Sequence, residues 1–327
     1  MDSQPQGSLP CGFLCPIATE GESRQMGYEV CVYGTVCVDR IRSVAQLPPP
    51  GGYVEVLEER WMPGGEALNT AIALATWNVQ VALVPNALGE DDLAEHLLQM
   101  LRGYPSLDLH FLQRRKDVQT PTCDVYVTPD GHRTMFGMGF AHMSSEAVPE
   151  EVLREVKVLT ADANPGEASV RACEQAASAG VPVVAMDLHG FERAARVADI
   201  LLTSYEWVGR SDAIDALQRI AAEYRQRFGC TVILTAGAKG AVLAEREHQH
   251  VVHLPAYRAP VVVDTTGSGD VFRAGLIYGC YVLQRDLPWA IRFGSAAAAL
   301  NAGAMGACAG VRPAQEIEQF MKTQPTV

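Results

Sequence analysis

The sequence predicts an α/β fold in which helices cover both faces of a mostly parallel sheet, together with a small second sheet. From 156 to 234, short apolar stretches alternate with helical patterns such as the strongly periodic 214–228. This alternation is typical of strand–helix–strand units. Three other stretches alternate like strands but have no helices of their own, and they predict the second sheet: 53–61, 122–127 and 132–136.

The composition is that of a soluble globular protein. The 327 residues are 48% hydrophobic and 20% charged, and a chain of this size buries a large core. The formal net charge of −12 argues against a nucleic-acid partner, because phosphate backbones need a basic surface. No apolar stretch reaches the roughly 18 residues of a membrane helix. Nine scattered cysteines and the lack of a signal-type leader indicate reduced thiols in a cytoplasmic protein.

The chain divides into an extension and one domain. Residues 1–27 are rich in Gly, Ser, Gln and Pro, so we expect a disordered N-terminal extension. Residues 28–327 are expected to form the α/β domain, with the second sheet inserted as a lid at about 40–62 and 120–138. The proline and glycine run at 48–52 is a predicted hinge or turn.

The first strand is predicted at 29–41, where apolar and β-branched residues alternate and Asp39 lies near the end. Ligands bind at the carboxyl ends of strands in open α/β sheets. Asp39 is therefore a candidate binding residue. The alternative is an ordinary solvated carboxylate at a strand end.

A helix is predicted within 62–77, where Gly64 and Gly65 come just before apolar residues at helical spacing. Paired glycines let a backbone approach a small ligand closely. The amide of Asn69 offers both a donor and an acceptor to neighbouring hydroxyls. The alternative is a helix start at which the glycines only shape the turn.

The most informative stretch begins with Val261–Val263, which predicts the end of a buried strand, and continues through a glycine turn into a helical pattern. The first N–H groups of a helix have no intrahelical partner and carry partial positive charge. Gly267, Ser268 and Gly269 are thus a candidate anion cradle, and Asp270 is a candidate carboxylate base. Such a pair suits phosphoryl transfer to a hydroxyl group.

Other interpretations of this turn remain open. A simple helix cap is one of them. A dinucleotide-binding loop would need a third glycine where Phe272 stands, and a P-loop would need a Gly-Lys pair that is absent. Arg273 lies on the same helix face as Asp270. It is expected either to meet a phosphate or an acidic substrate, or to form a surface ion pair.

The string DTTGSGDVFRAG at 264–275 resembles the C-terminal signature of the phosphofructokinase-B/ribokinase family of carbohydrate kinases. In that family the last aspartate is the catalytic base, and the glycine turn before it is the anion hole. The resemblance implies that Asp270 is the base and 267–269 the hole. Ser268 stands where the family usually has alanine, and it is small enough to be tolerated.

The resemblance extends from about residue 30 to residue 320 and includes the sugar side. GGEALN at 64–69 is similar to the family motif GGxxxN. It implies that Gly64, Gly65 and Asn69 contact the sugar. An aspartate near the first strand bonds sugar hydroxyls in the family, which implies this role for Asp39.

The nucleotide side is implied in the same way. Thr203 to Glu206 aligns with the family motif NxxE, so Glu206 would help to hold Mg²⁺ through water, although Thr203 replaces the asparagine. TAGAKG at 235–240 resembles the nucleotide loop TxGxxG. Thr235 and Gly237 would contact phosphates, and Gly240 would start the next strand. Two further nucleotide-side candidates are Thr266 and Ser295.

The resemblance implies a ribokinase-like three-layer α/β/α fold with a small β lid. The implied activity is ATP-dependent phosphorylation of a hydroxymethyl group on a small sugar or sugar acid, of the ribose, fructose or 2-keto-3-deoxygluconate type. A nucleoside kinase and a catalytically weak sugar or nucleotide sensor are the alternatives. The implied cofactors are ATP and Mg²⁺, with a monovalent cation such as K⁺ by analogy. Family lids often pair, so a homodimer through the lid is expected.

Overall fold

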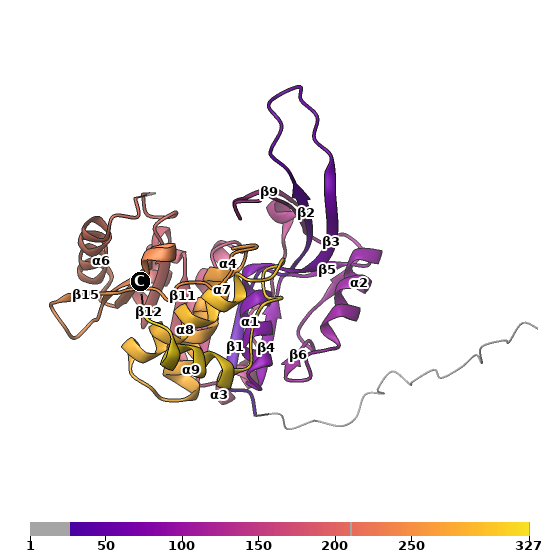
Figure 1. Cartoon of the computed structure of the whole chain (residues 1–327). Helices are drawn as coiled ribbons and strands as arrows, with labels where there is room; N and C mark the ends of the chain where they lie inside the picture. The colour runs from indigo at the N-terminus through magenta and orange to yellow at the C-terminus, as the bar shows by residue number, and fades with distance from the viewer. Residues whose placement is uncertain (1–26, 210, 327) are drawn as a thin grey trace, which may run out of the picture.

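The structure is a computed structural model that describes residues 27–209 and 211–326. At its centre lies a nine-stranded sheet in the order β15-β14-β13-β12-β11-β10-β1-β4-β6 (Figure 1). Neighbours from β13 to β6 pair in parallel, and β14 and β15 extend one edge antiparallel. The strands are β1 (Val30–Gly34), β4 (Val81–Pro85), β6 (Leu107–Asp108), β10 (Val158–Ala161), β11 (Val183–Met186), β12 (Ile200–Ser204), β13 (Thr231–Thr235), β14 (Ala241–Ala244) and β15 (Val251–Leu254).

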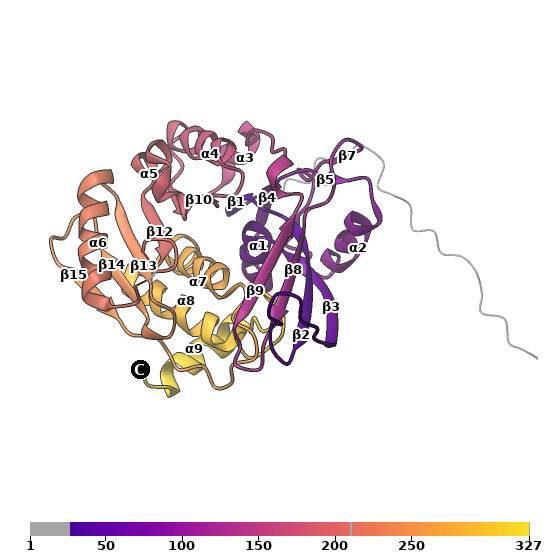
Figure 2. The same ribbon diagram turned by 90° about the horizontal axis from the view of Figure 1, so that it is seen from above.

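Helices cover both faces of this sheet (Figure 2). On one face lie α1 (Glu66–Thr76), α2 (Asp92–Leu101), α7 (Ser268–Ile277), α8 (Leu287–Asn301) and α9 (Ala314–Thr323). On the other face lie α3 (Glu150–Glu155), α4 (Glu167–Ser178), α5 (Glu192–Val197) and α6 (Ile214–Phe228). Along β1, Val30 and Val32 join the first core, while Cys31 and Tyr33 join the second, as alternation along a strand requires. The predicted three-layer fold is confirmed.

A separate four-stranded sheet has the order β3-β2-β8-β9. Its strands are β2 (Cys37–Val44), β3 (Val56–Gly64), β8 (Thr122–Val127) and β9 (Arg133–Met138). The β2–β3 hairpin projects well beyond the body (Figure 1). We refer to this sheet as the lid. A third sheet is small and pairs β5 (Leu88–Gly89) with β7 (Arg114–Arg115).

The predicted first strand is in fact two strands. The body strand β1 ends at Gly34 and the lid strand β2 begins at Cys37, so only Thr35 and Val36 join body to lid. Two buried side chains hold this junction. The carboxylate of Asp162 accepts hydrogen bonds from the main-chain N–H and the hydroxyl of Thr35, at 2.8 and 2.9 Å. The Asn86 side-chain oxygen accepts from the N–H of Val36 at 2.7 Å.

The prediction of a buried strand end at Val261–Val263 is wrong. The three side chains are 58%, 50% and 37% exposed, and the segment pairs with neither edge of the large sheet, which ends at β15 and β6. The main-chain N–H of Val263 instead donates to the carbonyl of Ala302 at the end of α8. β-Branched residues favour strands only where a sheet edge is within reach.

Other predictions concern segments and thiols. The expected extension 1–27 falls outside the described residues except for Gly27. Seven cysteines lie in the described part, all of them free thiols, and five are buried. Among the helices in the two described ranges, none combines the length and the apolar character that crossing a membrane requires.

Candidate active site

The glycine turn before α7 has the backbone that its sequence requires. Gly267 has φ +71°, and a Cβ there would overlap the main chain of Ala307, so only glycine fits. The helix begins at Ser268, which leaves its first N–H groups without intrahelical partners. Just before the turn, the buried carboxylate of Asp264 accepts from both the N–H and the hydroxyl of Thr266, at 2.8 and 2.6 Å. The hydroxyl of Thr266 is therefore already in use.

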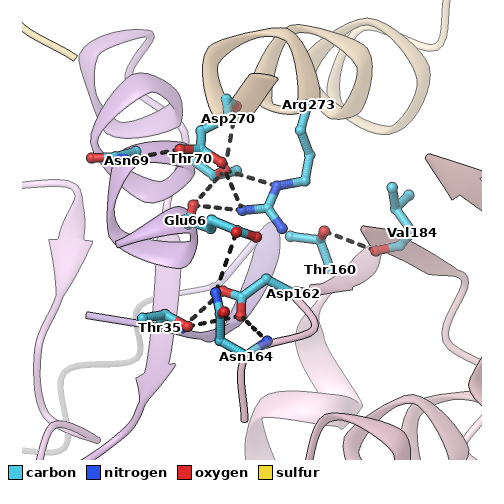
Figure 3. Close-up of polar contacts among 10 residues, drawn as sticks. All are labelled: Thr35, Glu66, Asn69, Thr70, Thr160, Asp162, Asn164, Val184, Asp270 and Arg273. Atoms are coloured by element: carbon cyan, nitrogen blue, oxygen red, sulfur yellow. Dashed lines mark hydrogen bonds and ion pairs between the residues drawn. The ribbon is translucent and has the colours of Figure 1, made fainter. Parts of the chain in front are cut away.

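Asp270 lies in the first turn of α7 and is only 5% exposed. It faces α1, where the side-chain amide of Asn69 donates to Asp270 Oδ2 at 2.8 Å (Figure 3). The other atom of that amide, Asn69 Oδ1, is buried and has no hydrogen-bond partner in the described structure. An unpaired buried acceptor is costly, and it would be satisfied by a ligand hydroxyl.

The paired glycines at the start of α1 bring Asp39 to the same place. A Cβ on Gly64 would overlap the Asp39 carboxylate, and one on Gly65, which has φ +98°, would overlap the Thr35 carbonyl. Both glycines are required for close approach. The sequence had indicated that Asp39 lies near the end of the first body strand. In the structure it lies instead within lid strand β2. The lid thus supplies one side of the site.

Burial controls the charge of both carboxylates. It raises the pKa of Asp39 to about 7; the hydrogen bond from the Cys37 thiol opposes this rise, and the charge of Asp270 adds to it. Burial likewise raises the pKa of Asp270 to about 6, against the opposing charge of Arg273 and the hydrogen bond from Asn69. A base with a pKa slightly below neutral is ionised at pH 7 and still accepts a proton readily.

Arg273 does not form the surface ion pair that was one of its two sequence expectations. Its side chain is fully buried, and its Nη1 has no hydrogen-bond partner among the described residues. Nε donates to the Thr70 hydroxyl at 2.8 Å, Nη2 donates to the Glu66 carbonyl, and Asp270 Oδ1 lies 3.7 Å from Nη2 (Figure 3). Arg273 therefore links α7 to α1 and stabilises the ionised form of Asp270. Every residue from 270 to 277 in α7 is buried, which a two-face helix pattern does not reveal.

Two more acidic residues around this site, Glu66 and Asp187, could not be singled out from the sequence. Glu66 Oε1 accepts from the Asn164 side chain at 3.2 Å, while Glu66 Oε2 is buried and has no partner among the residues that the structure describes. Burial raises the pKa of Glu66 well above its usual range, and the charge of Asp162 adds to this. Asp187 is 6% exposed, and burial raises its pKa to about 6. Glu66 fell in a motif position that tolerates many residues, so pattern alone gave no signal for it.

The nucleotide-side candidates lie at the ends of neighbouring strands. Ser204 and Thr235 are partners across β12 and β13, and Gly237 with φ +55° follows in the next turn. Glu206 is exposed in the turn after β12. Thr203 is buried, and its hydroxyl donates to Asp187 Oδ1 at 2.5 Å. The threonine in place of asparagine is therefore engaged with a second carboxylate.

Gly240 and Ser295 have structural contacts. Gly240 precedes β14, and a Cβ there would overlap the Leu254 carbonyl of β15. The Ser295 hydroxyl accepts from the N–H of Tyr257 at 3.2 Å. Neither of these contacts involves Asp270 or the glycine turn before it. Gly269 faces the end of β11, because a Cβ at this position would lie 3.4 Å from the Met186 side chain.

Comparisons with known proteins agree with this arrangement. The model of the pfkB family of carbohydrate kinases matches residues 28–314. Ribokinase from Staphylococcus aureus (strain COL) is 25% identical over 313 residues, covering 90% of this chain and 100% of the relative. Arabidopsis thaliana ribokinase, solved in complex with ribose and ATP, has a TM-score of 0.76 at 20% identity, with 91% of this chain and 99% of that chain covered. Burkholderia thailandensis nucleoside kinase, solved with inosine, has a TM-score of 0.72 at 20% identity and coverages of 90% and 97%.

The family model spans almost the whole described chain, and the solved relatives share the fold over nine tenths of it. The resemblance found in the sequence is thereby confirmed. The chain belongs to the pfkB family of carbohydrate kinases and is a phosphotransferase that has an alcohol group as acceptor.

Proposed function

We propose that the protein transfers the γ-phosphoryl group of ATP to a hydroxymethyl group of a small neutral sugar or nucleoside. One observation carries the proposal. Asp270 is buried directly after the glycine turn 267–269, which we call the glycine corner; it accepts a hydrogen bond from Asn69 of α1, and its charge acts on Asp39 of the lid. ATP is supported as the donor by the solved ribokinase relative that holds ribose and ATP. A cytoplasmic location suits the free thiols.

In the proposed reaction, the substrate hydroxyl lies against Asp270, which takes its proton. The bond from the hydroxyl oxygen to the γ-phosphorus forms as the bond from phosphorus to the β–γ bridging oxygen breaks. The electron pair of the broken bond leaves with ADP. N–H groups of 267–269 offset charge on the phosphoryl group, aided by the dipole of α7. Asn69 orients the base, Asp39 holds the acceptor hydroxyls, and the lid excludes water.

The residues present fit a Mg²⁺ ion held through water. Glu206 and Asp187 supply carboxylate oxygens at neighbouring strand ends, and Mg²⁺ usually keeps several waters beside one or two carboxylates and the substrate phosphates. Within the described ranges, no three His, Cys, Asp or Glu side chains are grouped for direct ligation. Bound there, Mg²⁺ would neutralise phosphate charge. Nothing in the described residues marks a K⁺ site.

The charges around Asp270 favour a neutral acceptor over a sugar acid. Asp39, Glu66 and Asp162 all act electrostatically on it or on one another. The nearby cation, Arg273, has protein partners at Nε and Nη2, while its Nη1 has none among the described residues. A substrate carboxylate would meet the negative charge of Asp270 and of whichever neighbouring carboxyl groups are ionised, at a cost of roughly 1–4 kcal/mol per close pair.

The test is magnesium-dependent ADP release with a panel of ribose, fructose, inosine and 2-keto-3-deoxygluconate. We expect turnover with at least one neutral compound, and at least about ten-fold lower kcat/KM for the sugar acid. Thermal shifts with each compound and a non-hydrolysable ATP analogue form the binding control. Binding without ADP release for every compound would replace the kinase proposal with a sensor. Preference for the sugar acid would contradict the charge argument.

We also propose that two lids pair in a homodimer. The edge strands of the lid expose large apolar side chains, including Leu57 at 64%, Phe136 at 60% and Met135 at 54%. Exposed apolar patches of this kind mark interaction sites. Sedimentation should show a dimer for the natural chain and a monomer for the variant Leu57→Glu/Phe136→Glu. A monomeric natural chain at micromolar concentration would contradict the proposal.

A further inference from the structure

An arginine of the lid touches the loop that leads into the glycine corner. Arg133 is the first residue of β9, and its Nη1 donates to the Thr265 hydroxyl at 3.0 Å. Thr265 precedes Gly267 by two residues. The same hydroxyl donates to the carbonyl of Gly131 at 3.4 Å. The turn between β8 and β9 is therefore in contact with the segment that begins the corner.

Arg133 has unused hydrogen-bonding capacity. The side chain is partly buried, and its Nε is buried with no hydrogen-bond partner within residues 27–209 and 211–326. No carboxylate lies within ion-pair distance of it in the described part of the chain. The other lid arginines differ in this respect, since each has a carboxylate partner: Arg40 with Asp124, Arg42 with Glu59 and Arg60 with Glu58. A guanidinium with a free buried N–H fits an anion with oxygen acceptors.

The position of Arg133 relates the corner to the nucleotide side. Burial is the main cause of the raised pKa of Tyr205, and the positive charge of Arg133 opposes that rise. The positive charge of Arg133 therefore acts on the turn that carries Glu206. Two other cations of this region differ from Arg133 in their partners. Lys239 pairs with Asp212 at 2.7 Å, and Arg273, although its Nη1 is also buried without a partner in the described residues, belongs to α7 and faces the carboxylate of Asp270.

We propose that Arg133 binds the phosphate groups of the nucleotide at the glycine corner and offsets charge on the phosphoryl group during transfer. This inference rests on the proposed function. Planar, bidentate recognition of phosphate oxygens is what a guanidinium does well. Because Arg133 belongs to the lid, a bound triphosphate would also draw the lid toward the body. The acidic sugar side and the cationic phosphate side would then close together.

The experiment compares Arg133→Gln with the matched control Arg60→Gln, which removes an exposed arginine from the same sheet. Calorimetry with ATP and with adenosine measures binding, and ADP release measures turnover. We expect Arg133→Gln to weaken ATP binding at least about ten-fold, to leave adenosine binding unchanged and to lower kcat by roughly 100-fold or more. Arg133→Lys should recover part of the ATP affinity, because it keeps the charge but loses the planar fork.

The outcomes separate this inference from the proposed function. Equal ATP affinity in Arg133→Gln and Arg60→Gln would overturn the role of Arg133, whatever the natural enzyme turns over. Absence of turnover by the natural chain on every substrate would overturn the proposed function, and the ATP comparison would still decide on Arg133. Circular dichroism checks that the variants fold. If Arg133→Gln does not, Arg133→Lys decides, because undiminished ATP binding with undiminished turnover would refute a bidentate contact.

Discussion

Replacing Asp270 by Asn should lower kcat by at least about 100-fold while leaving substrate and ATP binding nearly unchanged. Asparagine has the same shape, and its side-chain oxygen still accepts the hydrogen bond from Asn69 Nδ2 at this buried position. It cannot accept a proton, and loss of a general base typically costs roughly 100- to 10,000-fold. Steady-state kinetics and calorimetry on the same samples measure the two effects separately.

The pH profile provides an independent check of the same residue. Burial raises the pKa of Asp270 to about 6, so the base is ionised above that pH and protonated below it. We expect kcat/KM of the natural enzyme to fall as pH drops through about 6, and the residual rate of Asp270→Asn to lack this limb. Asp215→Asn, an exposed carboxylate on α6, serves as the control and should behave as the natural enzyme. Near-normal turnover in Asp270→Asn would remove this residue from the mechanism.

The second large effect is expected at Asp39, where Asn should stabilise the unliganded protein at about pH 8 and weaken sugar binding at least about ten-fold. The pKa of Asp39 rises from an ordinary 3.8 to about 7 in the folded chain. Above pH 7 both folded and unfolded chains hold the charge, and the folded chain bears the full burial penalty. Between pH 7 and 4 the folded chain takes up a proton and the penalty fades.

The gain from Asp39→Asn should therefore be largest at pH 8, on the order of 2–4 kcal/mol, and nearly absent at about pH 4. Urea unfolding at the two pH values measures it. ATP affinity should not change, because Asp39 lies on the sugar side. A variant that is less stable than the natural chain at pH 8 would show that the carboxylate supports the fold. Destabilising charge retained at a binding position is a common trade-off between stability and function.

The parts of this site that could be predicted are those set by neighbouring residues in the sequence. The parts that could not are set by residues far away in the sequence. The glycine corner and the paired glycines could be found because a positive φ or a close approach leaves no other residue type, as at Gly267 and Gly65. The split between β1 and β2 could not be found from the sequence, because Thr35 and Val36 continue the strand-like pattern. The junction is fixed by hydrogen bonds to Asp162 and Asn86, which are far away in the sequence.

The remaining misses have the same origin. A charged residue such as Arg273 in an otherwise apolar helix is expected at the surface, and only the packing of α1 against α7 buries it. Glu66 and Arg133 become relevant only through partners that are far away in sequence. Sequence patterns predict which face a residue occupies, but not which element will cover that face.

The two-residue junction at Thr35 and Val36 has a consequence for how this chain can vary. At this junction, the base of the lid is held by buried hydrogen bonds. The tip of the β2–β3 hairpin at 45–55 is instead largely exposed. Insertions, reporter groups or an appended module at the tip would leave the geometry near the acceptor hydroxyl intact. Even one residue added at the Thr35–Val36 junction would shift the whole lid and move Asp39 away from Asp270.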